Sequence, residues 1–333
     1  MDCSDSARED SRGLGDTTPV GNRAPDIVIR GMDYEHTLGV PGTHRDIMFG
    51  YELMGVGQTF NAMVPGRALE VCEFSLANYI TLRATGNDWL TAIPVFPYRA
   101  FRHSLAVTRK ESPLTSLREL GGRRVGVEDY SMTAAVWFRA LLREEYGVDH
   151  RSITWVTRPA QRLPRPAGAT VETIDADLEH LVGEGAIDAL LAVSSRDARL
   201  PANERRLRPL LPDPEREERA YYERTRIYPI HHTIVVRNDV LERFPGIVGV
   251  LCGAYESAKA QAYQRRLGAS LVPWASAHWA RTFDLFEGDP RPYGWTPANR
   301  AIVERLAANL HEQGFIPAVP DVDRLFALPT TAP

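Results

Sequence analysis

The chain has 333 residues, of which 44% are hydrophobic and 25% charged, and these ordinary globular values exclude a disordered chain or a fibre. Its formal net charge is −4 and like charges do not gather in long runs, so the sequence indicates neither a nucleic-acid surface nor a membrane-binding surface. The length is too great for one ordinary core and suits two lobes of average domain size.

Cys3, Cys72 and Cys252 are widely separated and fit neither a disulfide framework nor a zinc site, so a reducing compartment suits them best. Residues 1–25 contain no apolar stretch that could act as a secretory signal, and we expect a disordered leader there. No segment approaches the roughly 18 apolar residues that a membrane helix needs. We therefore expect a cytoplasmic protein whose partner is a small molecule.

The first part of the chain predicts strands alternating with helices. Residues 27–30 form a short β-branched strand, and residues 68–74 form a second strand that leads into a helix with Ser75 as its N-cap. Residues 90–96 and 104–108 are two further apolar strands on either side of a polar insert. A strand followed directly by a capped helix is typical of α/β proteins.

The middle of the chain continues this pattern, and its last part changes it. The elements expected in the middle are a short helix with a glycine stop at 117–122, a strand at 124–127, a long helix at 134–146, strands at 153–156 and 171–174, a helix at 177–184, and strands at 187–193 and 233–236. Beyond residue 240 only helices are predicted, at 247–264, 275–286 and 298–313.

Helices alone cannot close a separate sheet domain, so the simplest packing places the C-terminal helices on the first lobe. We therefore expect lobe 1 to comprise residues 26–124 and 229–333, and lobe 2 to comprise residues 125–228. An α/β lobe interrupted by a second α/β lobe resembles the type II periplasmic-binding-protein fold. That resemblance implies a ligand cleft between the lobes.

A long motif in the polar insert points to a family. The segment from Ala92 to Ser104, AIPVFPYRAFRHS, is similar to the I-P-V-F-x-x-R-x-F-R-H-S signature of the 4,5-dihydroxyphthalate decarboxylase family. Further matches follow in the same order along the chain: GVEDYSMTAAVW from Gly126, YPIHH from Tyr228, PYG from Pro292, and Asn299 with Arg300.

The resemblance implies a carboxy-lyase that removes CO2 from a hydroxylated aromatic acid without pyridoxal phosphate, flavin or thiamine, and no motif for a cofactor occurs in the chain. The sequence also lacks the Walker A, HExxH and GxSxG motifs of other enzyme classes. Two positions depart from the family pattern. His231 stands where Met is usual, and Asn78 stands where a small hydroxyl residue is common, so the exact substrate stays open.

Arg99 and Arg102 flank an aromatic residue in the polar insert, where a guanidinium group must meet an anion or solvent. Forked guanidinium groups suit carboxylates. A surface salt bridge is the commonest role of an arginine, but the resemblance favours contact with a substrate carboxylate, first of all by Arg99.

His103 opens one predicted strand and His232 precedes another, so both are expected at lobe edges where a histidine can transfer a proton. The alternative for each is a structural role. With the reaction that the resemblance implies, one of them protonates the ring carbon, and Glu73, at the end of a strand, receives or orients the phenolic proton.

The remaining candidates for substrate contacts are polar residues near predicted helix starts or within the family motifs: Ser75, Asn78, Tyr130, Ser131, Thr133, His231 and Tyr293. Capping of its own helix is an equally good reading of Ser75, and both roles can coexist at Ser131 and Thr133. Asp33 and Tyr34 are weaker candidates, and only the resemblance points to Asn299 and Arg300.

Two other classes of function stay open. One is a binding protein that captures a small organic acid without changing it, because this fold mostly serves that task. The other is a different lyase of the same fold, such as a chorismate dehydratase. The arginine and histidine string of the insert favours the decarboxylase. The sequence leaves the oligomeric state open, including a homo-oligomer.

Overall fold

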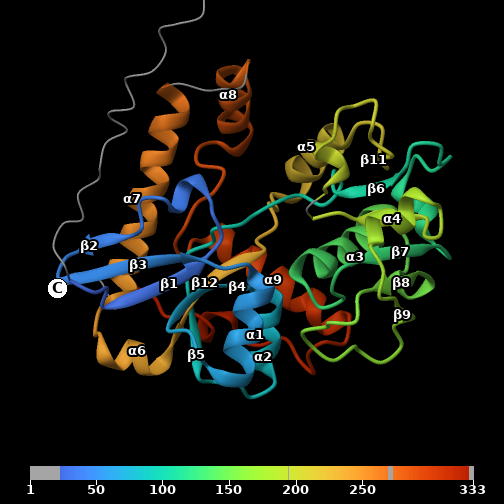
Figure 1. Cartoon of the computed structure of the whole chain (residues 1–333). Coiled ribbons are helices and arrows are strands. Elements are labelled where there is room, and N and C mark those ends of the chain that lie inside the picture. Colours follow the sequence, from blue (N-terminus) through green and yellow to red (C-terminus); the bar gives the residue numbers. More distant parts are fainter. Residues whose placement is uncertain (1–22, 194, 269–272, 330–333) are drawn as a thin grey trace, which may run out of the picture.

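The computed structural model describes residues 23–193, 195–268 and 273–329, and these form two mixed six-stranded sheets with helices packed around them (Figure 1). The two sheets lie in separate lobes, so the two-lobed α/β fold expected from the sequence is confirmed. The leader predicted for residues 1–25 lies almost wholly outside the described residues.

The first sheet has the strand order β2-β3-β1-β4-β12-β5. Strands β1, β3 and β4 are parallel, whereas β12 runs antiparallel to its neighbours β4 and β5. Every residue of β4 is buried, as expected for a central strand. The bounds are β1 Ile27–Gly31, β2 Gly42–His44, β3 Ile47–Leu53, β4 Val71–Ser75, β5 Leu90–Ile93 and β12 His232–Arg237.

The second sheet has the strand order β11-β6-β10-β7-β8-β9. Strands β7, β8, β9 and β10 are parallel, and β6 runs antiparallel to both β10 and β11. The bounds are β6 Ala106–Arg109, β7 Arg124–Val127, β8 Thr154–Thr157, β9 Val171–Thr173, β10 Ala189–Leu191 and β11 Leu207–Pro209.

The position of β6 differs from our expectation. We expected the chain to cross into the second lobe near residue 124, but β6 already pairs with β10 and β11 of the second sheet. The crossing therefore lies between β5 and β6, in the polar insert. The return crossing precedes β12, close to the expected residue 228, and the two crossing segments touch through a bridge between Arg99 and Ile230.

The helices cover the sheets and join the lobes. Helix α7 packs on the 3-10 helix η1, and α9 packs against both α2 of the first lobe and α3 of the second. The α-helices are α1 Val56–Gly66, α2 Leu76–Ala84, α3 Thr133–Tyr146, α4 Leu178–Gly183, α5 Pro214–Thr225, α6 Asn238–Arg243, α7 Ile247–Gly268, α8 Ala275–Phe286 and α9 Pro297–Glu312. The 3-10 helices are η1 Glu35–Thr37, η2 Leu117–Leu120, η3 His150–Ser152, η4 Asp197–Arg199 and η5 Val322–Arg324.

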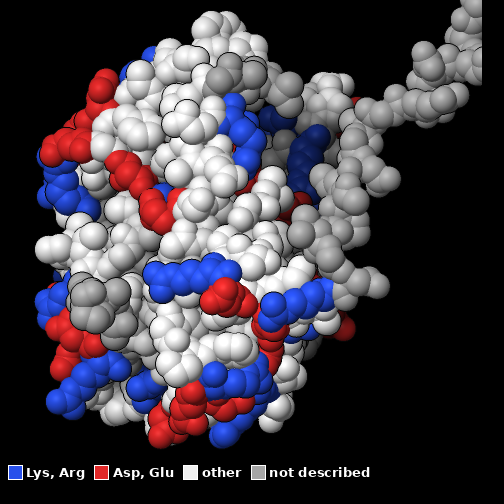
Figure 2. Space-filling model, turned by 90° about the vertical axis from the view of Figure 1, so that its left-hand side faces the viewer, with Lys and Arg blue, Asp and Glu red and all other residues white. Residues whose placement is uncertain are grey.

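The C-terminal helices α7, α8 and α9 match the three that the sequence predicts beyond residue 240. No helix in the described part of the chain is long and apolar enough to cross a membrane. Positive and negative side chains are interspersed on the face shown in Figure 2, which agrees with the balanced composition.

Candidate active site

Three polar segments meet at one edge of the first sheet. Strands β1 and β4 are parallel, so the loop after Gly31 and the end of β4 lie at the same edge. Strand β12 is antiparallel to β4 with His232 opposite Ser75, which brings the start of β12 to that edge as well. Ligands of open α/β sheets bind at the carboxyl ends of the strands. This edge is therefore the candidate site.

The carboxylate of Glu73 lies at the centre of this edge and is almost completely enclosed, with 1% of its side chain exposed. Its Oε1 atom lies 2.5 Å from Nδ1 of His232 and accepts a hydrogen bond of 2.9 Å from the Tyr34 hydroxyl. Its Oε2 atom accepts from the Met32 backbone N–H at 3.0 Å. A buried carboxylate needs such donors, and here they fix its orientation.

His232 is the exposed member of this pair, with 18% of its side chain accessible. Because Glu73 occupies Nδ1, Nε2 is the ring nitrogen that is left to meet a ligand. A carboxylate that holds one nitrogen of an imidazole sets the ring's tautomer and direction. The pair therefore has the geometry of a positioned proton donor or acceptor.

Aromatic rings surround the pair. The Tyr98 ring lies 5.1 Å from that of His232 and 6.0 Å from that of Tyr34, and Tyr34 in turn stacks on His36 at 5.1 Å. Burial and the charge of Glu73 raise the pKa of Tyr34, so its hydroxyl stays a neutral donor. Burial and the nearby Arg291 lower the pKa of His36, so this ring is neutral at pH 7.

Arg102 is a buried cation with unused donors. Its Nε lies 3.0 Å from Nε2 of His231, and its two terminal nitrogens have no hydrogen-bond partner among the described residues. Burial lowers the pKa of Arg102 to about 10, which leaves it charged at neutral pH. Burial and Arg102 hold the pKa of His231 well below 6.5, so this imidazole is neutral. A buried charge of this kind normally has an anionic partner.

Arg99 is also buried, but it is bonded to the C-terminal part of the chain. One of its terminal nitrogens donates to Pro292 O at 2.8 Å and to the Asn299 side chain at 2.6 Å. Asn299 is therefore a partner of Arg99, while Arg300 lies on the surface in an ion pair with Asp323. These contacts join the first crossing segment to the start of α9.

His103 lies away from the Glu73–His232 pair. Its ring packs against Tyr221 at 5.5 Å and Tyr146 at 6.2 Å, both in the second lobe. Burial and the charge of Arg224 lower its pKa to about 4. The two histidines that the sequence nominated together are thus in different surroundings.

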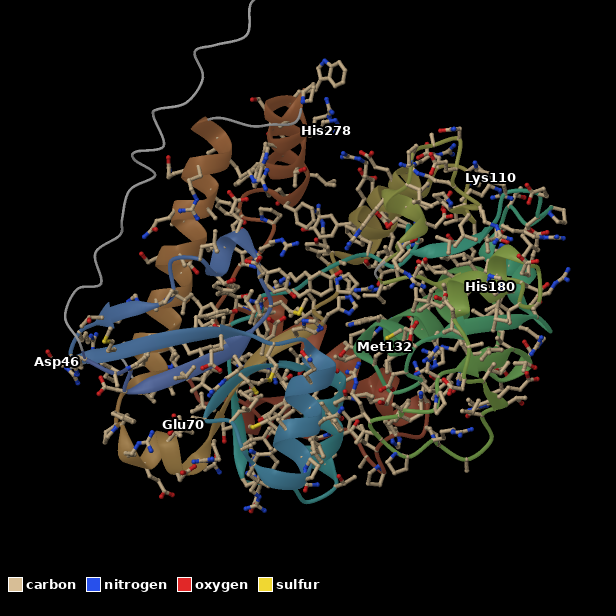
Figure 3. All side chains as sticks on the ribbon, viewed as in Figure 1. Asp46, Glu70, Lys110, Met132, His180 and His278 are labelled. Carbon is tan, nitrogen blue, oxygen red and sulfur yellow. The ribbon has the colours of Figure 1, made fainter. Side chains whose placement is uncertain are left out.

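Polar residues at the starts of α2 and α3 bond to each other across the two lobes. Ser75 and Thr133 share a hydrogen bond of 2.8 Å between their hydroxyls, and Asn78 donates to Ser131 O at 3.0 Å. The Asn78 side-chain oxygen accepts from Arg162 at 3.2 Å. Figure 3 labels Met132, the N-cap of α3, at the end of that helix that faces the first lobe. The lobes therefore touch here.

Two further predicted contacts lie elsewhere. Tyr130 is buried in the second lobe, where the Arg139 guanidinium stacks on its ring at 4.0 Å. Tyr293 lies under the Lys259 ammonium, 4.3 Å from its ring centre. Tyr34, a weak candidate from the sequence, is instead in direct contact with Glu73.

Sequence reasoning missed Tyr98, His36 and Arg291. Tyr98 stands inside the family motif and Arg291 directly precedes PYG, so both were within reach of a motif argument. Nothing in the sequence around His36 indicates its place beside Tyr34. In the described part of the chain, His, Cys, Asp and Glu side chains do not gather into a group of three that could hold a metal ion.

Two curated proteins are similar to this chain over long segments. A 4,5-dihydroxyphthalate decarboxylase of Comamonas testosteroni is 32% identical over 262 residues, which cover 74% of this chain and 78% of the relative. Another of that name from Pseudomonas putida is 34% identical over 132 residues, covering 37% of this chain and 51% of the relative. No protein-family model matches the chain.

Solved structures agree on the fold. The periplasmic aliphatic sulphonate binding protein SsuA of Escherichia coli superimposes with a TM-score of 0.59 at 15% identity, covering 92% of this chain and 93% of SsuA. A DSZB mutant in complex with biphenyl-2-sulfinic acid superimposes with a TM-score of 0.53 at 16% identity, covering 90% and 96% of the two chains. These likenesses support the periplasmic-binding-protein fold. At identities this low they show the fold and say nothing of function.

Proposed function

Because this chain belongs to the 4,5-dihydroxyphthalate decarboxylase family, we propose that it releases CO2 from 4,5-dihydroxyphthalate or a closely related hydroxylated aromatic acid, without an organic cofactor. The observation that carries the proposal is the buried Glu73 carboxylate, 2.5 Å from Nδ1 of the partly exposed His232. A binding protein or a chorismate dehydratase is not favoured, since the relatives that establish the family are decarboxylases.

The reaction needs one proton and a temporary place for one electron pair. A hydroxyl group para to the departing carboxylate loses its proton, and the ring carbon that bears the carboxylate takes up a proton, which gives a dienone. The bond to the carboxylate then breaks, CO2 leaves, and the electron pair restores the aromatic ring as a phenolate, which takes back the proton that the hydroxyl lost. Overall, one carboxylate and one proton become CO2 and a C–H bond.

We propose that Nε2 of His232 donates the proton that the ring carbon takes up. Glu73 positions this ring through Nδ1, and the hydrogen bonds from Tyr34 and Met32 hold Glu73 in turn. General acid catalysis by a positioned histidine contributes about 10²- to 10⁴-fold to a rate. Glu73 is a positioning residue in this scheme, because it is enclosed by its three partners.

Arg102 is the residue that we assign to a substrate carboxylate. Its terminal nitrogens are unpaired among the described residues, whereas Arg99 already donates to Pro292 and Asn299. The polar contacts between the starts of α2 and α3 would close the lobes over the bound acid and exclude water from the departing carboxylate. We further propose that the protein works in the cytoplasm, which a fractionation of cells would test.

The decisive experiment offers the purified protein a panel of hydroxylated aromatic diacids that includes 4,5-dihydroxyphthalate. We expect CO2 and the acid shortened by one carboxyl group in mass spectrometry. His232→Gln should lower kcat about 10²- to 10⁴-fold. Ligand-induced thermal stabilisation without CO2 from any acid would refute the decarboxylase and support a binding protein.

A further inference from the structure

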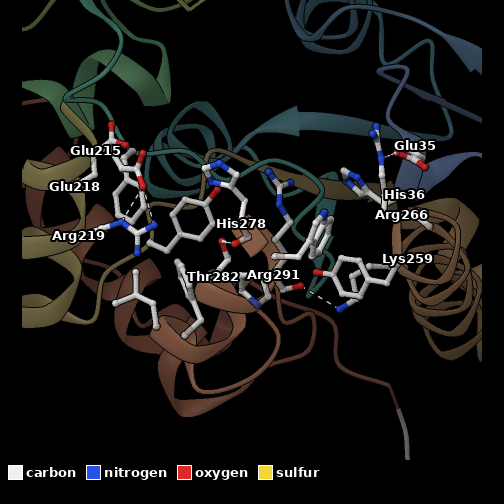
Figure 4. A pocket seen from close by; sticks show the side chains of 18 residues that line it. Glu35, His36, Glu215, Glu218, Arg219, Lys259, Arg266, His278, Thr282 and Arg291 are labelled. Atoms are coloured by element: carbon white, nitrogen blue, oxygen red, sulfur yellow. Dashed lines mark hydrogen bonds and ion pairs between the residues drawn. The ribbon is translucent and has the colours of Figure 1, made fainter. Parts of the chain in front are cut away.

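A cavity of about 420 Å³ lies between the two lobes, beside the crossing segments. It is bounded by η1, α7 and α8 of the first lobe and by α5 of the second (Figure 4). Phe286 of α8 contacts Tyr222 of α5 at 4.2 Å between ring centres, which joins the lobes next to the cavity. A volume of this size is typical of a small-molecule site.

The cavity wall combines aromatic rings with charged side chains. The apolar or aromatic residues of the wall are Phe101, Tyr228, Ala262, Tyr263, Trp279, Leu285, Phe286 and Pro290. Several of them already pair, with ring centres 4.7 Å apart in Phe101 and Tyr228 and 5.4 Å apart in Tyr263 and Trp279. Walls of this kind suit a flat ring, which gains stacking and edge contacts in addition to burial.

The charges on the wall are mostly neutralised by neighbours. Lys259 pairs with Asp289 at 2.6 Å, Arg219 pairs with Glu215 at 2.7 Å, and Arg266 pairs with Glu35. Figure 4 shows the Glu215–Arg219 pair on one side of the cavity and the Glu35–Arg266 pair on the other.

Among the described cations of the wall, Arg291 is the one without a carboxylate partner, and it lies between these two groups (Figure 4). The Glu218 carboxylate on the wall also has no ion-pair partner among the described residues and accepts from the Ser104 backbone N–H at 2.9 Å. Within the described part of the chain, the Arg291 guanidinium donates two long hydrogen bonds of 3.4 Å, to the backbone carbonyls of Pro97 and Arg99. No carboxylate among the described residues pairs with it. A guanidinium on the wall of an aromatic cavity, without an acidic partner, is well suited to a carboxylate of a bound molecule.

The cavity is distinct from the Glu73–His232 pair. Neither Glu73 nor His232 is among the described residues that line it. His36 does line it, and the His36 ring stacks on Tyr34, which in turn contacts Glu73, so two side chains connect the cavity wall to the pair. We propose that the cavity is a second binding site, for a small aromatic carboxylate, in which Arg291 contacts the carboxylate and the aromatic walls hold the ring. This site is additional to the decarboxylation site and does not depend on it.

The test uses 4-bromobenzoate, which lacks the hydroxyl needed to form a dienone, so binding is measured without the reaction. Isothermal titration should show binding to the wild-type chain, weakened at least tenfold in Arg291→Gln. Arg219→Gln is the matched control, because Arg219 lies on the same wall but is paired with Glu215. We expect its affinity to stay within threefold of wild type.

Crystals of the wild-type protein soaked in 4-bromobenzoate locate the site directly, even if a variant folds poorly. An anomalous bromine peak inside the cavity, with the carboxylate at Arg291, supports the proposal. A peak only beside His232, no peak at all, or unchanged affinity in a folded Arg291→Gln variant overturns it. The decarboxylation assay is separate, so failure of the proposed reaction leaves this result interpretable.

Discussion

Three donors converge on the carboxylate of Glu73: the Met32 backbone N–H, the Tyr34 hydroxyl and the His232 ring. A carboxylate can accept from all of them because it has two oxygens and no hydrogen to donate. A glutamine of the same shape would direct its NH2 group at one of these donors. The local arrangement therefore requires the acid at this position and also fixes the direction of His232.

This requirement gives a prediction for Glu73→Gln. Since the variant loses the fixed orientation of His232 but keeps His232 itself, kcat for the decarboxylation should fall by roughly 10- to 100-fold, less than in His232→Gln. The measurement is steady-state CO2 release as a function of pH. Glu70→Gln is the control, because Glu70 lies just before the same strand but pairs with Arg243 on the surface. If kcat fell equally in Glu73→Gln and Glu70→Gln, the role of Glu73 would be merely structural.

His103 should behave differently from His232. Because His103 packs against Tyr146 and Tyr221 rather than Glu73, His103→Gln should keep kcat within about threefold of wild type while lowering the melting temperature through lost packing. Activity and thermal unfolding of the same preparation test this. A loss of turnover as large as that in His232→Gln, in a folded protein, would contradict the assignment.

The sequence could nominate these residues but could not separate them. Glu73 was recognisable because a carboxylate at the end of an apolar strand must find partners. His103 and His232 looked equivalent, since both stand next to a strand. Their separation depends on β6 pairing with β10 and β11, more than 80 residues further along the chain. Local patterns carry no information on such pairing.

Among the elements, the starts of α2 and α3 are the ones that touch across the lobes. Ser75, Asn78, Ser131 and Thr133 were expected to bind substrate, and in the structure their polar atoms satisfy each other. Ser75 also caps α2, as the sequence predicted. These contacts stabilise the closed arrangement of the lobes. They therefore affect substrate affinity indirectly, by holding the two lobes together.

Asn78→Ala tests this role. The variant removes the hydrogen bonds to Ser131 and from Arg162, which should destabilise the closed arrangement by about 1–2 kcal/mol. If only closed lobes hold the substrate, KM rises roughly 5- to 30-fold while kcat stays near wild type. Small-angle scattering should show a larger radius of gyration. Asn61→Ala, at an exposed position on α1, should change neither quantity.

At the scale of the whole molecule, the two lobes and the C-terminal helices followed from the alternation of apolar runs and helical patterns. The first crossing did not, because the run at 104–108 looked like a continuation of the first sheet. In the structure, the segment between β5 and β6 is the crossing itself, and it carries Tyr98, Arg99, Arg102 and His103. The family motif thus spans the junction of the lobes, which explains why one short segment reaches several distinct environments.

Buried histidines in both lobes predict a loss of stability in mild acid. Burial lowers the pKa of His103 and His150 to about 4, and it holds that of His231 well below 6.5. Between pH 6.5 and 4 the unfolded chain therefore binds more protons than the folded one. The stabilisation is complete above pH 6.5 and is lost as the pH falls, by up to about 1.4 kcal/mol per pH unit for each histidine.

Urea unfolding at pH 7.5, 6.0 and 5.0, above the range in which most carboxylates titrate, measures this slope. We expect the free energy of unfolding to change little between pH 7.5 and 6.5 and to fall between pH 6.5 and 5.0, and His103→Gln to reduce this fall because one group no longer takes up a proton on unfolding. His278→Gln, a change at an exposed position of α8, should leave the slope as it is. A free energy of unfolding that stays constant from pH 7.5 to 5.0 would mean that these imidazoles are not held neutral by the fold.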